Sequence, residues 1–132
     1  MIRILLADDY AIIRKGVRQI LMQAYPNAEI EEIEEGEELA DKLKDTSWDM
    51  IISDLPEPHR GGWAALQRLH EDYPGLPVLI LSIYTREHDV LRALQAGASG
   101  YLGKDAAPHE LVWAVRQILA GKKYMAIPAG HN

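Results

Sequence analysis

The sequence predicts an α/β fold in which five strands alternate with five helices and form one parallel sheet. Two observations lead to this prediction. Short, continuous apolar runs recur along the chain, and between them lie longer stretches whose apolar residues repeat at helical spacing. Continuous apolar runs suit strands that are buried on both faces, as in a parallel sheet covered by helices on both sides. The length of 132 residues suits one compact domain.

The strands are expected where the apolar runs have strand length. Residues 2–7, 50–53 and 78–82 are the strong runs. Residues 28–33 form a weaker pattern within an acidic stretch, and residues 100–102 form a short last strand. Because each strand is followed by a helix, right-handed crossovers are expected, and all the strands should point the same way.

The helices are expected in residues 13–24, 39–43, 63–73, 90–97 and 111–119. Stop signals support several of these ends: Pro26 follows the first helix and Pro74 follows the third. Pro108 lies near the first turn of the fifth helix and Gly121 lies at its end, which is the usual asymmetry of helix termini.

Polar residues stand where the predicted strands end. These residues are Asp8 and Asp9 after the first strand, Asp54 at the third, Ser82 at the fourth and Lys104 after the fifth. Ligands of open α/β sheets bind at the carboxyl ends of the strands, near the point where the strand order reverses. Three carboxylates, a hydroxyl and an ammonium are therefore expected to converge at one edge of the sheet.

This set of side chains points to phosphoryl chemistry. Clustered carboxylates repel one another and favour a hard cation, so Mg²⁺ held partly through water is the expected occupant. A carboxylate beside Mg²⁺ can attack phosphorus and form an aspartyl phosphate. The metal and a lysine neutralise charge on the transferring group, while a hydroxyl donates to one of its oxygens.

Four segments carry a resemblance to a known family. They read LLADDYAIIRKG, IISDLPEP, LILSIYTREHDVLRALQAGASGYLGKDAAPHEL and VRQILAGKKY. They resemble the receiver domain of two-component response regulators of the NarL/FixJ type, in which a LuxR-type helix-turn-helix follows the receiver. The resemblance runs from Ile2 to about Tyr124. It implies a flavodoxin-like (βα)5 doubly wound sheet of five parallel strands in the order 2-1-3-4-5.

The resemblance also implies a role for each matching residue. Asp54 matches the aspartate that accepts the phosphoryl group, and Lys104 matches the phosphoryl-binding lysine. Asp9 matches a direct metal ligand, whereas Asp8 holds the metal through water or assists nearby. Asp54 itself and the backbone carbonyl of Pro56 complete the implied ligands of Mg²⁺.

Two further residues match the conformational switch of the family. The hydroxyl of Ser82 is similar to the one that turns toward the phosphoryl group, and Tyr101 to the aromatic residue that follows it inward. Phosphorylation by a sensor histidine kinase or a small phosphodonor would bias a two-state surface at the fourth helix and the fifth strand. That surface is expected to serve an output domain or a homodimer partner.

Four residues depart from the pattern of the family. Glu57 replaces a bulky apolar residue close after the phosphoacceptor, and Tyr10 stands where relatives often have histidine. Gly103 replaces a large apolar residue, and Asp105 stands where many receivers have proline. Glu57 is a possible modulator of metal affinity and phosphorylation. It keeps open the alternative of a pseudo-receiver, a binding module that is not phosphorylated.

Two enzyme classes with a similar fold are disfavoured. A flavodoxin needs a phosphate loop rich in glycine and hydroxyls after the first strand, where Asp8 and Asp9 would repel phosphate. A haloacid-dehalogenase-type phosphatase needs a second acid two residues after its nucleophile, where Pro56 stands. The chain is therefore expected to be a phosphoacceptor and switch, not an enzyme, although it assists its own phosphorylation and dephosphorylation.

Composition and charge exclude several other classes of function for this segment. The net charge of −6 argues against DNA binding by this segment alone, because phosphate backbones are held mainly by Lys and Arg. The chain has no cysteine, which excludes thiolate chemistry. No apolar run approaches the length of a membrane span, and the first residues do not form a signal peptide, so no membrane contact and a cytoplasmic location are expected.

The domain organisation is expected to be simple. Residues 1–124 should form the receiver domain, and residues 125–132 a tail or the start of a linker toward an absent output domain. The segment at Lys122 and Lys123 resembles the start of such a linker. A fragment of a longer regulator is favoured over a stand-alone receiver.

Overall fold

Strands and helices alternate along the chain, as the sequence predicts. The structure, a computed structural model, describes residues 1–8, 10–34, 37–45, 47–54 and 62–126. Its elements are β1 (Arg3–Ala7), α1 (Ala11–Ala24), β2 (Glu29–Ile33), α2 (Glu37–Asp45), β3 (Met50–Asp54), α3 (Gly62–Asp72), β4 (Val78–Ser82), α4 (Glu87–Gln95), β5 (Gly100–Gly103), α5 (Pro108–Leu119) and β6 (Tyr124–Met125).

The strands form one parallel sheet in the order β2-β1-β3-β4-β5-β6. The predicted flavodoxin-like architecture and the order 2-1-3-4-5 are confirmed. The strand number needs one correction, because the described part of the chain adds a sixth strand beside β5. Tyr124 pairs with Gly100 and Met125 with Tyr101. A strand of two residues has no periodicity that a sequence could reveal, and it forms because β5 offers an open edge.

The last described residues are attached to the edge of the sheet. Met125 belongs to β6, and the amide of Ala126 donates a hydrogen bond to the carbonyl of Tyr101 at 3.0 Å. The division into residues 1–124 and a tail from residue 125 stays a prediction. Residues 127–132 lie outside the described residues.

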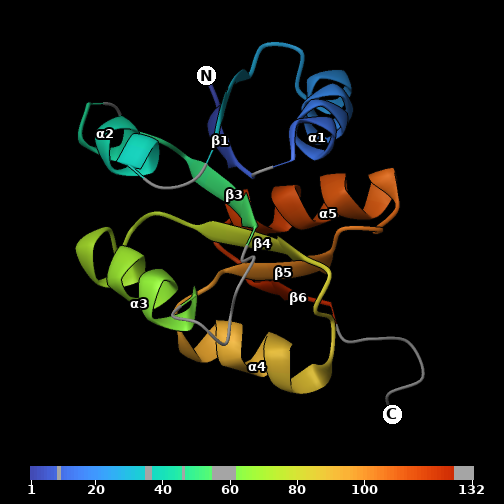
Figure 1. The fold of residues 1–132 in the computed structure, drawn as a ribbon. Helices are drawn as coiled ribbons and strands as arrows, with labels where there is room; N and C mark the ends of the chain where they lie inside the picture. The colour runs from blue at the N-terminus through green and yellow to red at the C-terminus, as the bar shows by residue number, and fades with distance from the viewer. Residues whose placement is uncertain (9, 35–36, 46, 55–61, 127–132) are drawn as a thin grey trace.

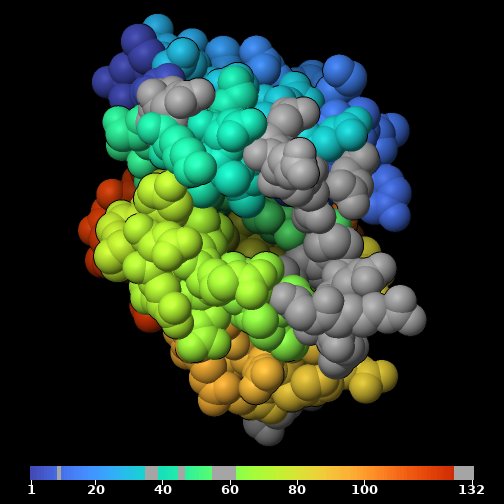
Figure 2. Space-filling view, turned by 60° about the vertical axis from the view of Figure 1, so that its left-hand side comes forward, coloured from blue at the N-terminus to red at the C-terminus, as the bar shows by residue number. Residues whose placement is uncertain are grey.

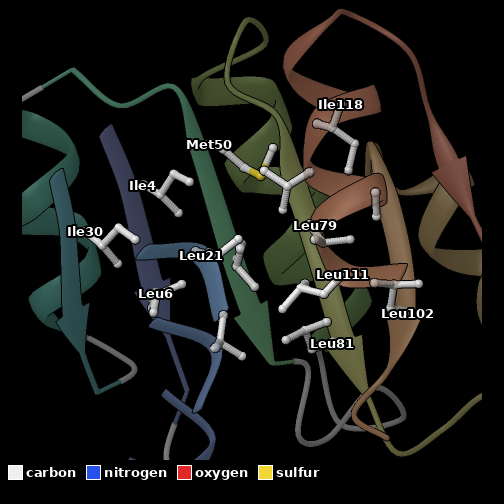
Figure 3. Close-up of a cluster of buried hydrophobic side chains, with 14 residues drawn as sticks. Ile4, Leu6, Leu21, Ile30, Met50, Leu79, Leu81, Leu102, Leu111 and Ile118 are labelled. Carbon is white, nitrogen blue, oxygen red and sulfur yellow. The ribbon is translucent and has the colours of Figure 1, made fainter. Parts of the chain in front are cut away.

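Helices cover both faces of the sheet. Figure 1 shows α1 and α5 together on one side, with α2, α3 and α4 on the other. Figure 3 shows the core under α1 and α5, where strand side chains point toward both helices. The labelled members of this cluster are Ile4, Leu6, Leu21, Ile30, Met50, Leu79, Leu81, Leu102, Leu111 and Ile118, all buried. Burying such a side chain contributes about 1.5–3 kcal/mol.

The opposite face of the sheet uses the alternate residues of the same strands. Figure 2 shows α2, α3 and α4 one after another along this side. Leu5 and Ile51 pack toward Leu43 of α2, whereas Ile80 packs with Val90 of α4. Because successive strand residues point to opposite faces, both faces need apolar residues, which explains the continuous runs. Among the described helices, none combines the length and the apolar character that crossing a membrane requires.

Candidate functional site

The strand register brings the predicted site residues to one edge of the sheet. Ala7 of β1 pairs with Ser53 of β3, so the next residues, Asp8 and Asp54, lie at neighbouring strand ends. On the other side of β3, Asp54 pairs with Leu81 of β4. The chain winds outward in both directions from β1 and β3, so this edge is the switch point where the fold predicts a ligand site.

Lys104 holds the two aspartates together. Its Nζ lies 3.3 Å from Oδ2 of Asp8 and 3.2 Å from Oδ2 of Asp54. All three side chains are largely buried, with exposed fractions of 11% for Lys104, 7% for Asp8 and 5% for Asp54. Desolvation by burial lowers the pKa of Lys104, but hydrogen bonds and charge attraction from Asp54 and Asp8 outweigh it, so the net pKa is raised. The ammonium is therefore retained as a cation inside an acidic site.

Arg14 holds the backbone beneath Asp8, which the sequence analysis did not foresee. Its guanidinium donates a hydrogen bond to the carbonyl oxygen of Asp8. Its Nε lies 3.4 Å from Oε1 of Glu32, and Glu32 also lies 3.7 Å from Arg18. Arg14 sits between Ile13 and Val17 on the buried side of α1. A cation on the apolar side of a helix was the one sequence signal that could have indicated this contact.

The backbone of Tyr84 connects the two predicted switch residues. The Oγ of Ser82 accepts a hydrogen bond from the amide of Tyr84 at 2.9 Å. The hydroxyl of Tyr101 donates a hydrogen bond to the carbonyl oxygen of Tyr84. Both Ser82 and Tyr101 are 1% exposed, so Tyr101 points inward in this structure. Sequence reasoning missed Tyr84, because a backbone contact leaves no trace in residue type.

Electrostatics keep the phenol of Tyr101 neutral. Burial raises the pKa of Tyr101, and the negative charges of Asp89 and Asp54 raise it further, although a hydrogen bond with Ser82 acts in the opposite direction. Asp89 lies in the first turn of α4 and is itself buried. The neutral phenol can therefore act as the donor to Tyr84.

The described residues fit part of a magnesium site. Asp8 and Asp54 supply buried carboxylate oxygens of the kind that Mg²⁺ prefers, and the contacts of Lys104 show that both can face one cation. Among the described residues, no group of three or more His, Asp or Glu side chains forms a metal cluster. The remaining predicted ligands, Asp9 and the carbonyl of Pro56, lie outside the described residues, as does Glu57.

The other departures from the family pattern lie around Lys104. A Cβ at Gly103 would come within 2.7 Å of Oδ1 of Asp105 and 3.1 Å of Cγ2 of Thr85, so the missing side chain leaves room for these neighbours. The ring of Tyr10 lies beside the Lys104 ammonium, with its centroid 4.9 Å from Nζ. Tyr10 and Gly103 therefore both belong to the immediate surroundings of this lysine.

Sequence and structure comparisons identify the family. The model of the response regulator receiver domain family matches residues 4–116, so the chain belongs to this family. The chain is 32% identical over 126 residues to the response regulator UvrY of Escherichia coli, covering 96% of this chain and 58% of UvrY. It is 32% identical over 126 residues to the response regulator GacA of Pseudomonas protegens, covering 96% of this chain and 59% of GacA.

A solved structure supports the same assignment. A LuxR family DNA-binding response regulator from Silicibacter pomeroyi superimposes with a TM-score of 0.79 at 29% identity, covering 96% of this chain and 97% of the other. These likenesses place the chain with the receivers of the NarL/FixJ type. The chain spans about three fifths of the length of UvrY and GacA.

Proposed function

We propose that Asp54 accepts a phosphoryl group and thereby switches a partner surface of the domain. The observation that carries this proposal is the pair of contacts from Lys104 to Asp54 and Asp8. These contacts place an ammonium directly beside the candidate nucleophile. Without a cation beside it, a buried carboxylate would repel an anionic phosphodonor, because both groups are negatively charged.

The proposed step is a displacement at phosphorus. A carboxylate oxygen of Asp54 forms a bond to the phosphorus of a phosphohistidine or an acyl phosphate, and the bond from phosphorus to the donor nitrogen or oxygen breaks. The leaving group keeps that electron pair, so the product is an acyl phosphate on Asp54. Lys104 neutralises charge on the transferred group. When bound, Mg²⁺ supplies further neutralisation of phosphoryl charge; Asp8, Asp9, Asp54 and the carbonyl of Pro56 would hold it.

The switch is proposed to run through Ser82 and Tyr101. The hydroxyl oxygen of Ser82 accepts from the Tyr84 amide, so its proton remains available for a hydrogen bond to a phosphoryl oxygen. A movement of Ser82 toward that oxygen would shift the Tyr84 backbone. Tyr101 is bonded to the carbonyl of the same Tyr84, so a shift of this backbone reaches β5. The neighbouring first turn of α4 would then move with it, which is how a local charge reaches a partner surface.

The partners follow from the same proposal. A sensor histidine kinase or a small phosphodonor supplies the phosphoryl group, and an output domain or a second copy of the chain receives the signal. The chain acts as a phosphoacceptor and not as an enzyme on another substrate. We propose a cytoplasmic location, where such donors occur. The acidic segment of 132 residues does not bind DNA specifically by itself; sequence-specific binding in a mobility-shift assay would contradict this.

The decisive experiment is intact mass spectrometry after incubation with acetyl phosphate, with and without Mg²⁺. We expect one added phosphoryl group that requires Mg²⁺, and no addition in Asp54→Asn. Asn keeps the size and the buried position but lacks the nucleophilic carboxylate. Undiminished labelling of Asp54→Asn would mean that another residue accepts the group. The absence of labelling in the unmodified protein would favour the pseudo-receiver, the binding module that is not phosphorylated.

A further inference from the structure

Tyr10 contributes the aromatic surface on which the Lys104 ammonium rests. The 4.9 Å between Nζ and the ring centroid lies within the range of about 6 Å in which a cation is attracted to an aromatic face. The same ammonium contacts the carboxylates of Asp8 and Asp54. Lys104 is thus enclosed by two acids from neighbouring strand ends and by a ring from the residue before α1.

We propose that Tyr10 is a positioning residue that holds the Lys104 ammonium ready for the phosphoryl group. The inference rests on the proposed function of Asp54. Phosphorylation would replace the carboxylate oxygen of Asp54 that Lys104 contacts by a phosphoryl oxygen. A metal ion between the carboxylates would compete for Asp8. Of the three described side chains that the ammonium contacts, Tyr10 is the one that neither event changes.

The ring is not required for the local fold. The amide of Tyr10 donates to Oδ1 of Asp8 at 2.9 Å, and its carbonyl accepts from the amides of Ile13 and Arg14. These hydrogen bonds come from the backbone, and the side chain is exposed. Replacing the side chain therefore tests the ring alone, while the backbone turn that leads into α1 is retained.

Physical chemistry indicates why a ring helps here. A lysine side chain has four rotatable bonds, and it loses binding strength when its ammonium is spread over many positions. A flat aromatic face attracts the ammonium without neutralising it, so the charge stays available to the phosphoryl group. A leucine at the same position would fill similar space without this attraction.

The test compares Tyr10→Phe, which keeps an aromatic face, with Tyr10→Leu, which keeps apolar bulk without one. The first measurement needs no phosphodonor: the NMR shift of the Lys104 ε-methylene protons, assigned by their disappearance in Lys104→Arg. We expect an upfield ring-current shift in the unmodified protein and in Tyr10→Phe, and its loss in Tyr10→Leu. An unchanged Lys104 signal in Tyr10→Leu would overturn the contact and the proposal.

The second measurement is the affinity for beryllofluoride, a phosphoryl mimic, in the presence of Mg²⁺. We expect Tyr10→Phe to bind within about twofold of the unmodified protein and Tyr10→Leu to bind about three- to tenfold more weakly. Equal affinity of both variants would overturn the positioning role, even where the ring-current shift is lost. If the unmodified protein binds no beryllofluoride, the proposed function fails, and the role of Tyr10 in phosphoryl binding fails with it. The NMR result then still decides whether ring and ammonium meet.

Discussion

The amide nitrogen of Ala126 donates a hydrogen bond to the carbonyl oxygen of Tyr101 over 3.0 Å, which ties the end of the described chain to the proposed aromatic switch. Met125 pairs with Tyr101 in parallel register and packs against the same hydrophobic cluster. Residues 124–126 are therefore attached to β5, and a displacement of Tyr101 would move them as well.

This bond can be removed by Ala126→Pro, because proline has no amide hydrogen. We expect the free energy of unfolding to fall by about 0.5–1.5 kcal/mol, the usual contribution of one hydrogen bond. Ala126→Gly keeps the donor and is the matched control. Urea denaturation followed by tryptophan fluorescence measures both variants. Equal stability of the proline and glycine variants would show that β6 contributes nothing through this bond.

Because Lys104 pairs with two buried aspartates, the effect of a Lys104 substitution on stability should depend on whether Asp54 is charged. Lys104→Met removes the ammonium, keeps a similar stem and leaves the carboxylates of Asp8 and Asp54 facing each other. We expect a loss of about 3 kcal/mol in the free energy of unfolding, because an uncompensated buried charge is costly. In an Asp54→Asn background the same change should cost clearly less, since one negative charge is already gone. A double-mutant cycle by denaturant titration tests this coupling, which additive losses would refute.

Arg14 and Arg18 both approach Glu32, but substituting Arg14 should lower the free energy of unfolding more than substituting Arg18. Arg14→Gln removes the cationic donor to the carbonyl of Asp8 and leaves Glu32 with its longer contact to Arg18, so we expect a loss of about 1–3 kcal/mol. Arg18 is the control: it also donates a hydrogen bond to a backbone carbonyl, that of Ile30 at 2.9 Å, but its side chain is 46% exposed, so Arg18→Gln should cost under about 1 kcal/mol. Thermal and chemical denaturation of the two variants give the comparison. Similar losses would mean that the contact with Asp8 adds nothing.

The raised pKa of Tyr101 predicts a stability change at alkaline pH. Burial disfavours the phenolate, so the folded-state pKa lies above the ordinary value of 10.0. The neutral phenol therefore contributes stability that is fully present below pH 10.0 and is lost as the pH rises through the raised pKa. The difference in unfolding free energy between the unmodified protein and Tyr101→Phe should be constant at neutral pH and shrink at alkaline pH. A difference that stays constant above the pKa of free tyrosine would contradict the raised pKa.

Glu57 lies outside the described residues, so its effect stays a prediction from sequence. One more negative charge near the metal should make Mg²⁺ binding several-fold tighter than in Glu57→Met. The same charge repels an anionic phosphodonor, so phosphorylation at saturating Mg²⁺ should be slower than in that variant. Calorimetric titration with Mg²⁺ at low ionic strength is the measurement. Equal affinities would mean that Glu57 faces solvent.

The sequence by itself determined the alternation of strands and helices and the chemistry at the strand ends. Continuous apolar runs such as residues 78–82 have few alternatives to a strand buried on both faces. Asp54 and Lys104 could be assigned to one edge because parallel strands share the direction of their carboxyl ends. These predictions depend on local pattern and on the topology that it enforces.

The tertiary structure decided the contacts that no local pattern encodes. β6 needs the open edge of β5, Arg14 reaches a carbonyl six residues earlier in the chain, and the Tyr84 backbone bridges Ser82 to Tyr101. Each of these contacts uses backbone atoms, which every residue except proline carries in the same form. Residue identity therefore leaves the backbone partner of each contact unspecified. Only the packing of α1 on the sheet and the register of the strands bring the partners within hydrogen-bonding distance.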